Sequence, residues 1–176
     1  MKLSRLFSPR PAVLAGRRLY AAAAAQARQP AFYAAMGAPD TVEGRFELYT
    51  LHLALILRRL KGQGARAAET AQALFDAYVR GLDDALREMG VGDLSVGKKM
   101  RKLGEAFYGR VRHYDDALGA LPDRTELEAI LARTVLMGDA GAAGPFADYA
   151  ISAMAGLERQ QLAALLEGDV EWPQVQ

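Results

Sequence analysis

The feature that most constrains the fold is a run of apolar residues three or four positions apart between residues 96 and 118. Positions with this spacing fall on one face of an α-helix. The run therefore predicts a long helix with a single apolar stripe against a core, and Ser95 directly before it is a suitable N-cap. The members of the stripe are Val96, Met100, Leu103, Phe107, Val111, Tyr114 and Leu118.

The residues before this stripe also favour helices, and no segment shows the strict alternation of a half-buried strand. A first helix is expected from about residue 13 to residue 28, ending before Pro30. Thr41 can cap a second helix over residues 42–60. That helix is apolar on nearly all sides, which predicts that it is central and buried. A third, amphipathic helix is expected over about residues 66–89.

The residues after the stripe predict two more helices. Asp123, followed by Glu126 three positions later, indicates the start of a fifth helix that ends near Met137. Pro145 suits the first turn of a sixth helix, which would end near Glu167. The last six residues are expected to be loose.

Together these elements predict an all-α fold, a single compact domain of about six helices over residues 13–170 behind a basic N-terminal extension over residues 1–12. A chain of 176 residues suits one domain. It has no Cys, which excludes disulfides, zinc ribbons and iron–sulfur clusters. No apolar stretch approaches the roughly 20 residues of a membrane span. The Arg-rich start has no acidic residue before Asp40, which leaves a secretory signal, a transit peptide or a helix of the mature protein; we favour the helix.

The charges are unevenly distributed although the net charge is only +1: Lys and Arg prevail up to residue 113, and Asp and Glu after it. Basic residues gather on the side of the 96–118 helix opposite its stripe, with only Glu105 against them. Such a surface suits an anionic lipid surface, ribosomal RNA or an acidic partner segment; an ordinary solvated helix face is the competing interpretation. We call this surface the basic ridge and define it as Lys98, Lys99, Arg101, Lys102 and Arg110.

Two patterns that resemble catalytic or nucleotide sites do not carry that chemistry. Residues 92–98 read G-x-x-x-x-G-K, but Lys99 stands where a phosphate-binding loop needs Ser or Thr, and a helix precedes the segment in place of a strand. The paired acids at 83–84 and 115–116 are adjacent on a helix and point about 100° apart, so we interpret them as solvated. Asp115 and Asp116 are expected to pair with Arg112.

The two histidines do not make a metal site by themselves. His52 lies in the middle of the apolar helix and is interpreted as a hydrogen-bonded core residue, and His113 as a surface residue. We predict no enzyme activity, no metal and no cofactor. Haem binding through His52 and an unrecognised all-α enzyme stay open as alternatives.

The segment 87–110, REMGVGDLSVGKKMRKLGEAFYGR, resembles the ubiquinol–cytochrome c chaperone family. Two further segments agree: residues 25–33 with Pro39-Asp-Thr41, and residues 44–60. The resemblance covers about residues 20–118 and is weaker over the last two helices.

The resemblance implies a helical, non-enzymatic assembly factor for the cytochrome bc1 complex. Family members bind newly made cytochrome b and keep it competent for assembly. Mitochondrial members act with a small partner protein near the ribosomal exit, in the matrix against the inner membrane. This chain starts close to its family-like segment, so we expect a bacterial form in the cytoplasm or peripherally on the inner membrane, with the mitochondrial matrix as the alternative. Whether it has the small partner is open.

A binding site can be formulated from the residues. The basic ridge would contact acidic loops of the client or anionic lipid, and Asp93 with Gly92 would fix its orientation. Exposed apolar residues in a neighbouring helix groove would shield a membrane segment of the client. A module that binds the ribosome or another RNA through the same face is the rival function; DNA is not expected as a partner.

Overall fold

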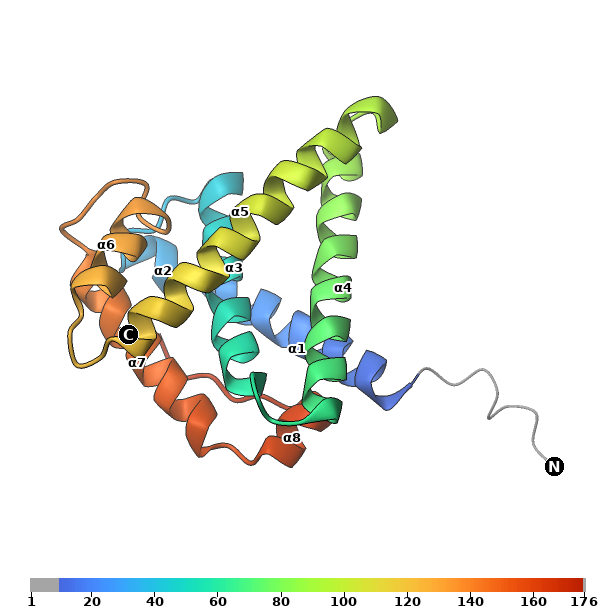
Figure 1. Ribbon diagram of the computed structural model, residues 1–176. Helices are drawn as coiled ribbons and strands as arrows, with labels where there is room; N and C mark the ends of the chain where they lie inside the picture. Colours follow the sequence, from blue (N-terminus) through green and yellow to red (C-terminus); the bar gives the residue numbers. More distant parts are fainter. Residues whose placement is uncertain (1–9, 176) are drawn as a thin grey trace.

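The structure is a computed structural model and describes residues 10–175 (Figure 1). These residues form helices without strands, which confirms the all-α prediction. Six helices have nine residues or more, and α2 and α8 are shorter. The predicted N-terminal extension lies largely outside the described residues. In chain order the helices are α1 (Pro11–Ala27), α2 (Pro30–Ala34), α3 (Val42–Leu60), α4 (Ala65–Glu88), α5 (Asp93–Gly119), α6 (Thr125–Arg133), α7 (Ala143–Arg159) and α8 (Leu162–Glu167).

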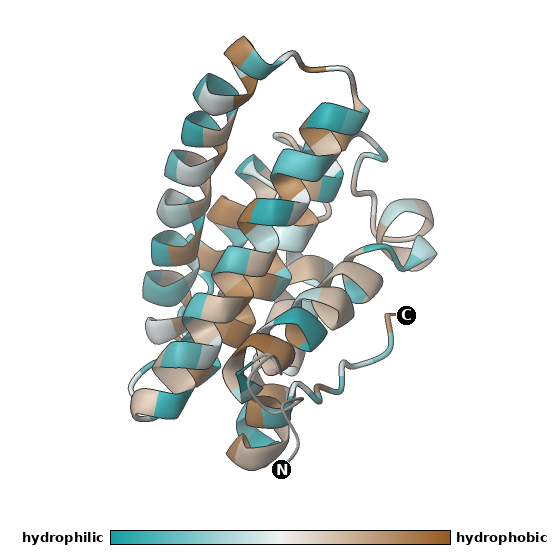
Figure 2. Ribbon diagram, turned by 90° about the vertical axis from the view of Figure 1, so that its right-hand side faces the viewer, coloured by the Kyte–Doolittle hydropathy of each residue, from teal (hydrophilic) through white to brown (hydrophobic). Residues whose placement is uncertain are grey.

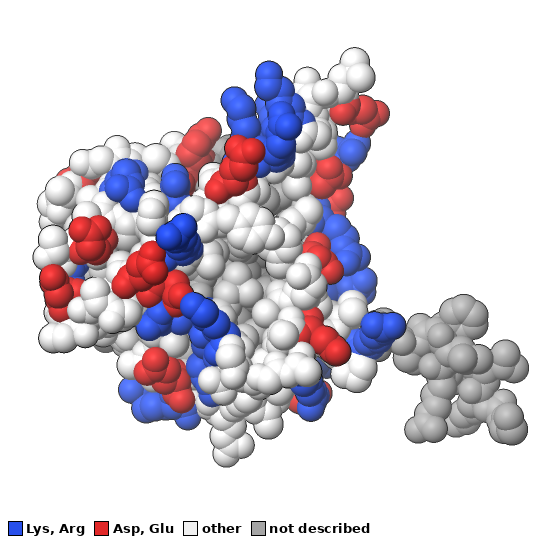
Figure 3. Space-filling view, viewed as in Figure 1, with Lys and Arg blue, Asp and Glu red and all other residues white. Residues whose placement is uncertain are grey.

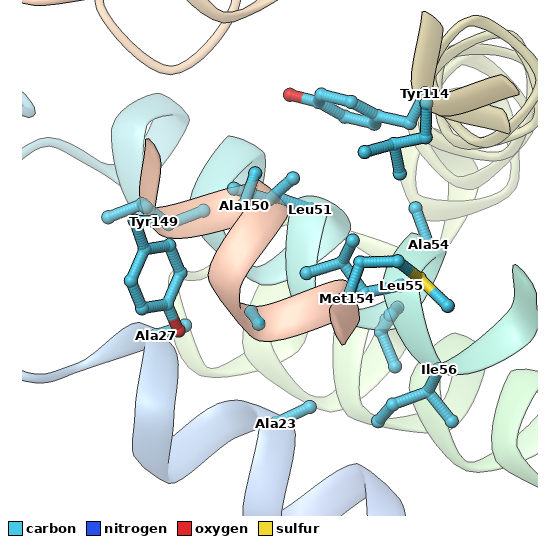
Figure 4. Packing of buried hydrophobic residues seen from close by; sticks show 14 of the residues in the cluster. Ala23, Ala27, Leu51, Ala54, Leu55, Ile56, Tyr114, Tyr149, Ala150 and Met154 are labelled. Carbon is cyan, nitrogen blue, oxygen red and sulfur yellow. The ribbon is translucent and has the colours of Figure 1, made fainter. Parts of the chain in front are cut away.

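Helix α3 is the centre of the fold, as its composition predicts. Thr41 caps it: the Thr41 hydroxyl accepts the Gly44 N–H at 3.0 Å. Helices α1, α5 and α7 pack on α3. Figure 4 shows side chains from these four helices meeting in one apolar cluster, with Leu51 and Leu55 on α3 and Met154 on α7. The outer faces of the helices are mostly polar (Figure 2).

Helices α4 and α5 form an antiparallel hairpin whose free end extends past the rest of the molecule (Figure 1). Helix α5 begins at Asp93 with Gly92 as N-cap, so the predicted cap at Ser95 is wrong by three positions. The predicted stripe is buried at Phe107 and Tyr114, but Leu103, nearer the free end, is only half-buried. Val96, at the free end, is also buried, but it is not part of the central apolar cluster. The stripe therefore packs on that cluster only over the part of α5 that lies on α3.

Several predicted boundaries are corrected by the structure. Pro30 does not simply end the first helix; it occupies the first position of α2, where proline's missing N–H costs nothing. Helix α6 begins at Thr125 and ends at Arg133, earlier than Met137, because residues 134–138 form turns.

The predicted sixth helix is two helices. Helix α7 begins at Ala143 and ends at Arg159, and α8 follows after Gln160 and Gln161. Both glutamines have extended backbone angles. Neither is a proline or a glycine, so no local signal in the sequence marks this break.

The C-terminal segment is packed against the body, so the expectation of a loose tail is wrong. The ring of Trp172 meets that of His52 edge-on, with centroids 4.9 Å apart. The Gln26 side-chain amide donates to the Pro173 carbonyl at 3.2 Å. The Gln160 side chain exchanges two hydrogen bonds of 2.9 Å with the backbone of Glu171. These contacts hold the segment across α1, α3 and α7.

A buried hydrogen-bond chain joins the same helices. His52 is fully buried; its Nδ1 lies 2.7 Å from the Leu48 carbonyl and its Nε2 lies 2.7 Å from the Tyr149 hydroxyl. The carbonyl can only accept, so Nδ1 carries the proton and Nε2 accepts from Tyr149. Tyr149 in turn accepts from Gln26 at 3.1 Å. Burial lowers the pKa of His52 to about 4, so the ring is neutral near pH 7. The prediction of a hydrogen-bonded core histidine is confirmed.

Candidate functional site

Four of the five residues of the basic ridge lie exposed on the N-terminal part of α5, toward the free end of the hairpin. The structure records no ion pair for any of the four within residues 10–175. Figure 3 shows Lys and Arg side chains gathered at this end of the molecule. A cluster of like charges without partners is a surface for an anionic group. We call Lys98, Lys99, Arg101 and Lys102 the distal cations.

Arg110, the fifth residue of the ridge, is placed differently. Its Nη2 donates to Glu47 Oε1 at 3.0 Å, and its Nε donates to Glu47 Oε2 at 3.1 Å. The Glu47 side chain is 9% exposed and that of Arg110 28%. The hydrogen bonds to Glu47 raise the pKa of Arg110. This bidentate pair joins α5 to α3, so Arg110 positions the hairpin and has its charge compensated.

Gly92 is the N-cap of α5, directly after the turn from α4, and Asp93 is the first residue of α5. Arg87 near the end of α4 forms ion pairs with Asp83 on its own helix and with Asp93 at the start of α5. The hydrogen bonds to these two carboxylates raise the pKa of Arg87. The side chain of Asp93 is thus engaged with Arg87, and the contact joins the two helices at the free end of the hairpin.

An apolar groove of about 700 Å³ opens between the hairpin and the body of the protein. Helix α4 contributes Leu82 and Leu86, with Met89 as its C-cap, and α3 contributes Val42 and Phe46. Part of α1 and Tyr33 of α2 complete its walls. The amphipathic pattern of α4 predicts the apolar face that carries Leu82 and Leu86. No pattern in the sequence indicates which residues of α1 and α3 lie opposite that face.

Two tyrosines form part of the groove wall beside α4. The Tyr49 hydroxyl donates to the Tyr20 carbonyl at 3.1 Å, and the two rings are 5.4 Å apart. Gly81 lets α4 pass over Tyr20, because a Cβ at this position would lie 1.9 Å from the Tyr20 hydroxyl oxygen. Burial raises the pKa of Tyr49, so the wall is uncharged there.

The distal cations divide into two pairs with respect to the groove. Lys99 and Lys102 are among the residues that line it, whereas Lys98 and Arg101 are not. Each pair has the same three-residue spacing on the same helix. The sequence predicts one continuous ridge, but the tertiary structure directs one pair toward the apolar groove and leaves the other outside it.

The remaining candidate groups have other surroundings. Both ring nitrogens of His52 are engaged in hydrogen bonds inside the core, which leaves neither for a haem iron. His113 is exposed, as expected. Asp116 pairs with Arg112 at 3.8 Å as predicted, but Asp115 pairs with Arg58 and Lys61 of α3 and its following turn. The two cations lower the pKa of Asp115.

The Gly92–Lys99 segment follows helix α4, and residues 10–175 contain no strand that could precede it. Within the same range, no group of three or more His, Asp or Glu side chains is arranged to hold a metal ion. None of the helices described there is long and apolar enough to span a bilayer. What the arrangement offers is an apolar surface with cations on its rim, which suits non-covalent recognition of a partner.

Comparisons with known proteins identify the family of this chain. The sequence profile of the family described as ubiquinol–cytochrome C chaperone matches residues 34–172. The ubiquinol–cytochrome-c reductase complex assembly factor 1 of Xenopus laevis is 24% identical over 123 residues, which are 70% of this chain and 60% of that protein. This chain therefore spans less than two thirds of the length of that relative.

A solved structure is similar over almost the whole chain. The crystal structure of the Cbp3 homolog from Brucella abortus superposes with a TM-score of 0.83 at 36% sequence identity. The match covers 92% of this chain and 90% of the other. With a family profile that matches most of its length, this protein belongs to the ubiquinol–cytochrome c chaperone family.

Proposed function

We propose that this protein is an assembly chaperone of the cytochrome bc1 complex that binds newly synthesised cytochrome b without catalysing a reaction. Family membership supports the role in assembly, and the printed name of the Xenopus relative describes the same process. Cytochrome b as the client is the more specific part of the proposal. A membrane subunit exposes long apolar segments before it is inserted and joined to its partners, so it needs a binding surface that covers them.

The observation that carries the proposal is the groove beside the distal cations. Its lining is mostly apolar and includes Phe46, Leu82 and Met89, and Met89 is 53% exposed. Such a surface costs stability in water unless a partner uses it. The cations on its rim add attraction to carboxylates or to the phosphates of a membrane surface. An RNA partner would use the cations but would leave the apolar groove empty.

The cellular setting follows from the client. The proposed client is a membrane subunit, so we propose that this protein acts at the inner face of the membrane that receives it. The similarity to the Brucella abortus structure supports the bacterial cytoplasm, with the mitochondrial matrix as the alternative. The distal cations would then lie close to anionic headgroups as well as to the client.

Affinity capture of the tagged protein from its own cells tests the proposal. Quantitative mass spectrometry should show cytochrome b enriched above other membrane proteins. The variant with Lys98→Glu and Lys102→Glu should lose most of that enrichment. A matched variant, Arg112→Glu with Arg133→Glu, changes the charge equally at exposed positions that do not line the groove and should keep it.

The result that would overturn the proposal is capture of ribosomal components alone, released by moderate salt. Binding through phosphate contacts falls with a log–log salt slope of about −0.9 for each contact on a duplex, or about −0.7 on single strands. Capture of a client held partly by apolar contacts should survive the same increase in salt.

A further inference from the structure

The apolar face of α4 continues past the body of the protein. Over the first half of the helix this face is covered: Leu74 and Tyr78 are buried where α4 packs along α1. Farther along the helix the same face lines the groove through Leu82, Leu86 and Met89. Leu86 is still buried, Leu82 is half-buried, and Met89 is 53% exposed. The groove thus occupies the position that a further packed helix would fill.

The groove walls favour a helix over an extended segment as the occupant. They come from α-helices, whose backbone N–H and C=O groups are already bonded within each helix. An extended peptide would find no edge strand here to pair with and would bury its own amides unsatisfied. A helix satisfies its backbone internally and packs its side chains into the grooves between neighbouring ridges.

The length of the groove sets the length of the occupant. Its lining on α4 extends from Gly81 to Met89, about 12 Å at 1.5 Å per residue, or roughly two helical turns. Two turns present three or four apolar side chains on one face. A volume of about 700 Å³ is large enough for such a set of side chains.

The rim determines which charges the occupant carries. Lys99 and Lys102 lie on the α5 side, and Arg28 of α1 also lines the groove; the structure gives none of the three an ion pair within residues 10–175. The lining has two acidic residues: Glu47 is paired with Arg110, and Glu43 is a single carboxylate against these three cations. The rim therefore has cations in excess, which attract carboxylates and repel a basic segment.

We infer that the groove between α4–α5 and α1–α3 binds a two-turn apolar helix of the client, flanked by carboxylates that contact Lys99 and Lys102. The assignment rests on the proposed function, because it names the part of the client that is recognised. It divides the distal cations into two pairs: Lys99 and Lys102 contact the client helix, and Lys98 and Arg101 do not.

Peptide binding to the purified full chain tests the inference. The probe is a fluorescein-labelled helical peptide of about 14 residues, four turns, with Leu on one face and Glu at both ends of the apolar face. One matched peptide has Lys in place of each Glu, and another has a central Pro that interrupts the helix. Fluorescence anisotropy should give the Glu peptide an affinity at least about tenfold higher than either matched peptide.

Three variants locate the binding. Lys99→Glu with Lys102→Glu should lower the affinity for the Glu peptide about tenfold or more and raise the affinity for the Lys peptide. Lys98→Glu with Arg101→Glu makes the same change in charge on the same helix. The affinity of this variant for the Glu peptide should stay within about twofold of that of the unmodified protein, because only the long-range attraction changes. Ala85→Trp, at an exposed position in the groove, should block both peptides while the circular dichroism spectrum stays unchanged.

Four results would overturn the inference. Equal losses in the two double variants would mean general charge attraction. Unchanged binding in Ala85→Trp would place the peptide elsewhere. Equal binding of the Pro-interrupted peptide would exclude recognition of a helix. Sodium oleate that binds in the groove when the Glu peptide does not would make an anionic lipid the occupant.

The affinity capture described above separates this inference from the proposed function. If Ala85→Trp still captures cytochrome b as the unmodified protein does, the groove assignment fails and the chaperone function stands. If the unmodified protein captures no cytochrome b but the peptides bind as expected, the chaperone function fails and the groove remains a site for acidic helices.

Discussion

The two ends of the molecule handle their apolar surface and their polar groups differently. Around His52, packed helices and the C-terminal segment cover the apolar side chains, and the buried side chains of His52, Tyr149 and Gln26 form a chain of hydrogen bonds. At the free end of the α4–α5 hairpin, an apolar face such as that of Met89 stays open and cations such as Lys99 have no recorded partner. The first end stabilises the fold; the second keeps surface available for binding, which is where we place the function.

The largest expected effect contrasts the core with the groove. Phe32 is fully buried and stacks on Phe146 with ring centroids 5.9 Å apart. Phe32→Ala should lower the free energy of unfolding by about 3–5 kcal/mol, since it leaves a cavity. Leu82→Ala, on the groove wall, should cost about 1 kcal/mol because Leu82 is only half-buried. Urea denaturation followed by circular dichroism measures both, and equal costs would mean that the groove is as tightly packed as the core.

The second prediction concerns the pH dependence at the His52 end. Burial lowers the pKa of His52 to about 4, against an ordinary value of 6.5. Between these values the unfolded chain binds one proton more at this residue, so the contribution is complete above pH 6.5 and is lost as the pH falls toward 4. The loss amounts to about 3 kcal/mol, at 1.4 kcal/mol per pH unit.

His52→Gln removes the titrating group and isolates that contribution. Urea denaturation across this pH range should give a slope of unfolding free energy against pH that is smaller by up to one proton in the variant. Carboxylates such as Asp115 contribute equally to the slope in both proteins. An identical slope in the two proteins would mean that His52 is not neutral and buried in solution.

The smallest expected effect separates Arg110 from the distal cations. Arg110→Ala leaves the mostly buried Glu47 carboxylate without its partner and should lower the free energy of unfolding by about 2 kcal/mol. Lys102→Ala, at an exposed position, should change it by less than about 0.5 kcal/mol. Thermal denaturation measures both, and the pair Glu47→Gln with Arg110→Met should recover most of the loss. If Arg110→Ala is as mild as Lys102→Ala, Arg110 belongs with the binding surface.

Local patterns predict the central elements of this fold well. The apolar composition of α3, with Thr41 before it, is sufficient to place that helix and its burial, because both signals act within a few residues. The regular stripe predicts α5 for the same reason. By contrast, the break between α7 and α8 at Gln160 and the docking of Trp172 depend on contacts with residues far away in the sequence, which no local pattern encodes.

The sequence by itself determined the helical class, the central place of α3, the positive charge of one face of α5 and the resemblance that led to the family. Only the tertiary structure decided that Arg110 is held by Glu47 while Lys99 and Lys102 line an apolar groove. The reason is physical: helical periodicity determines which residues share a face, but what covers that face depends on where the other helices lie.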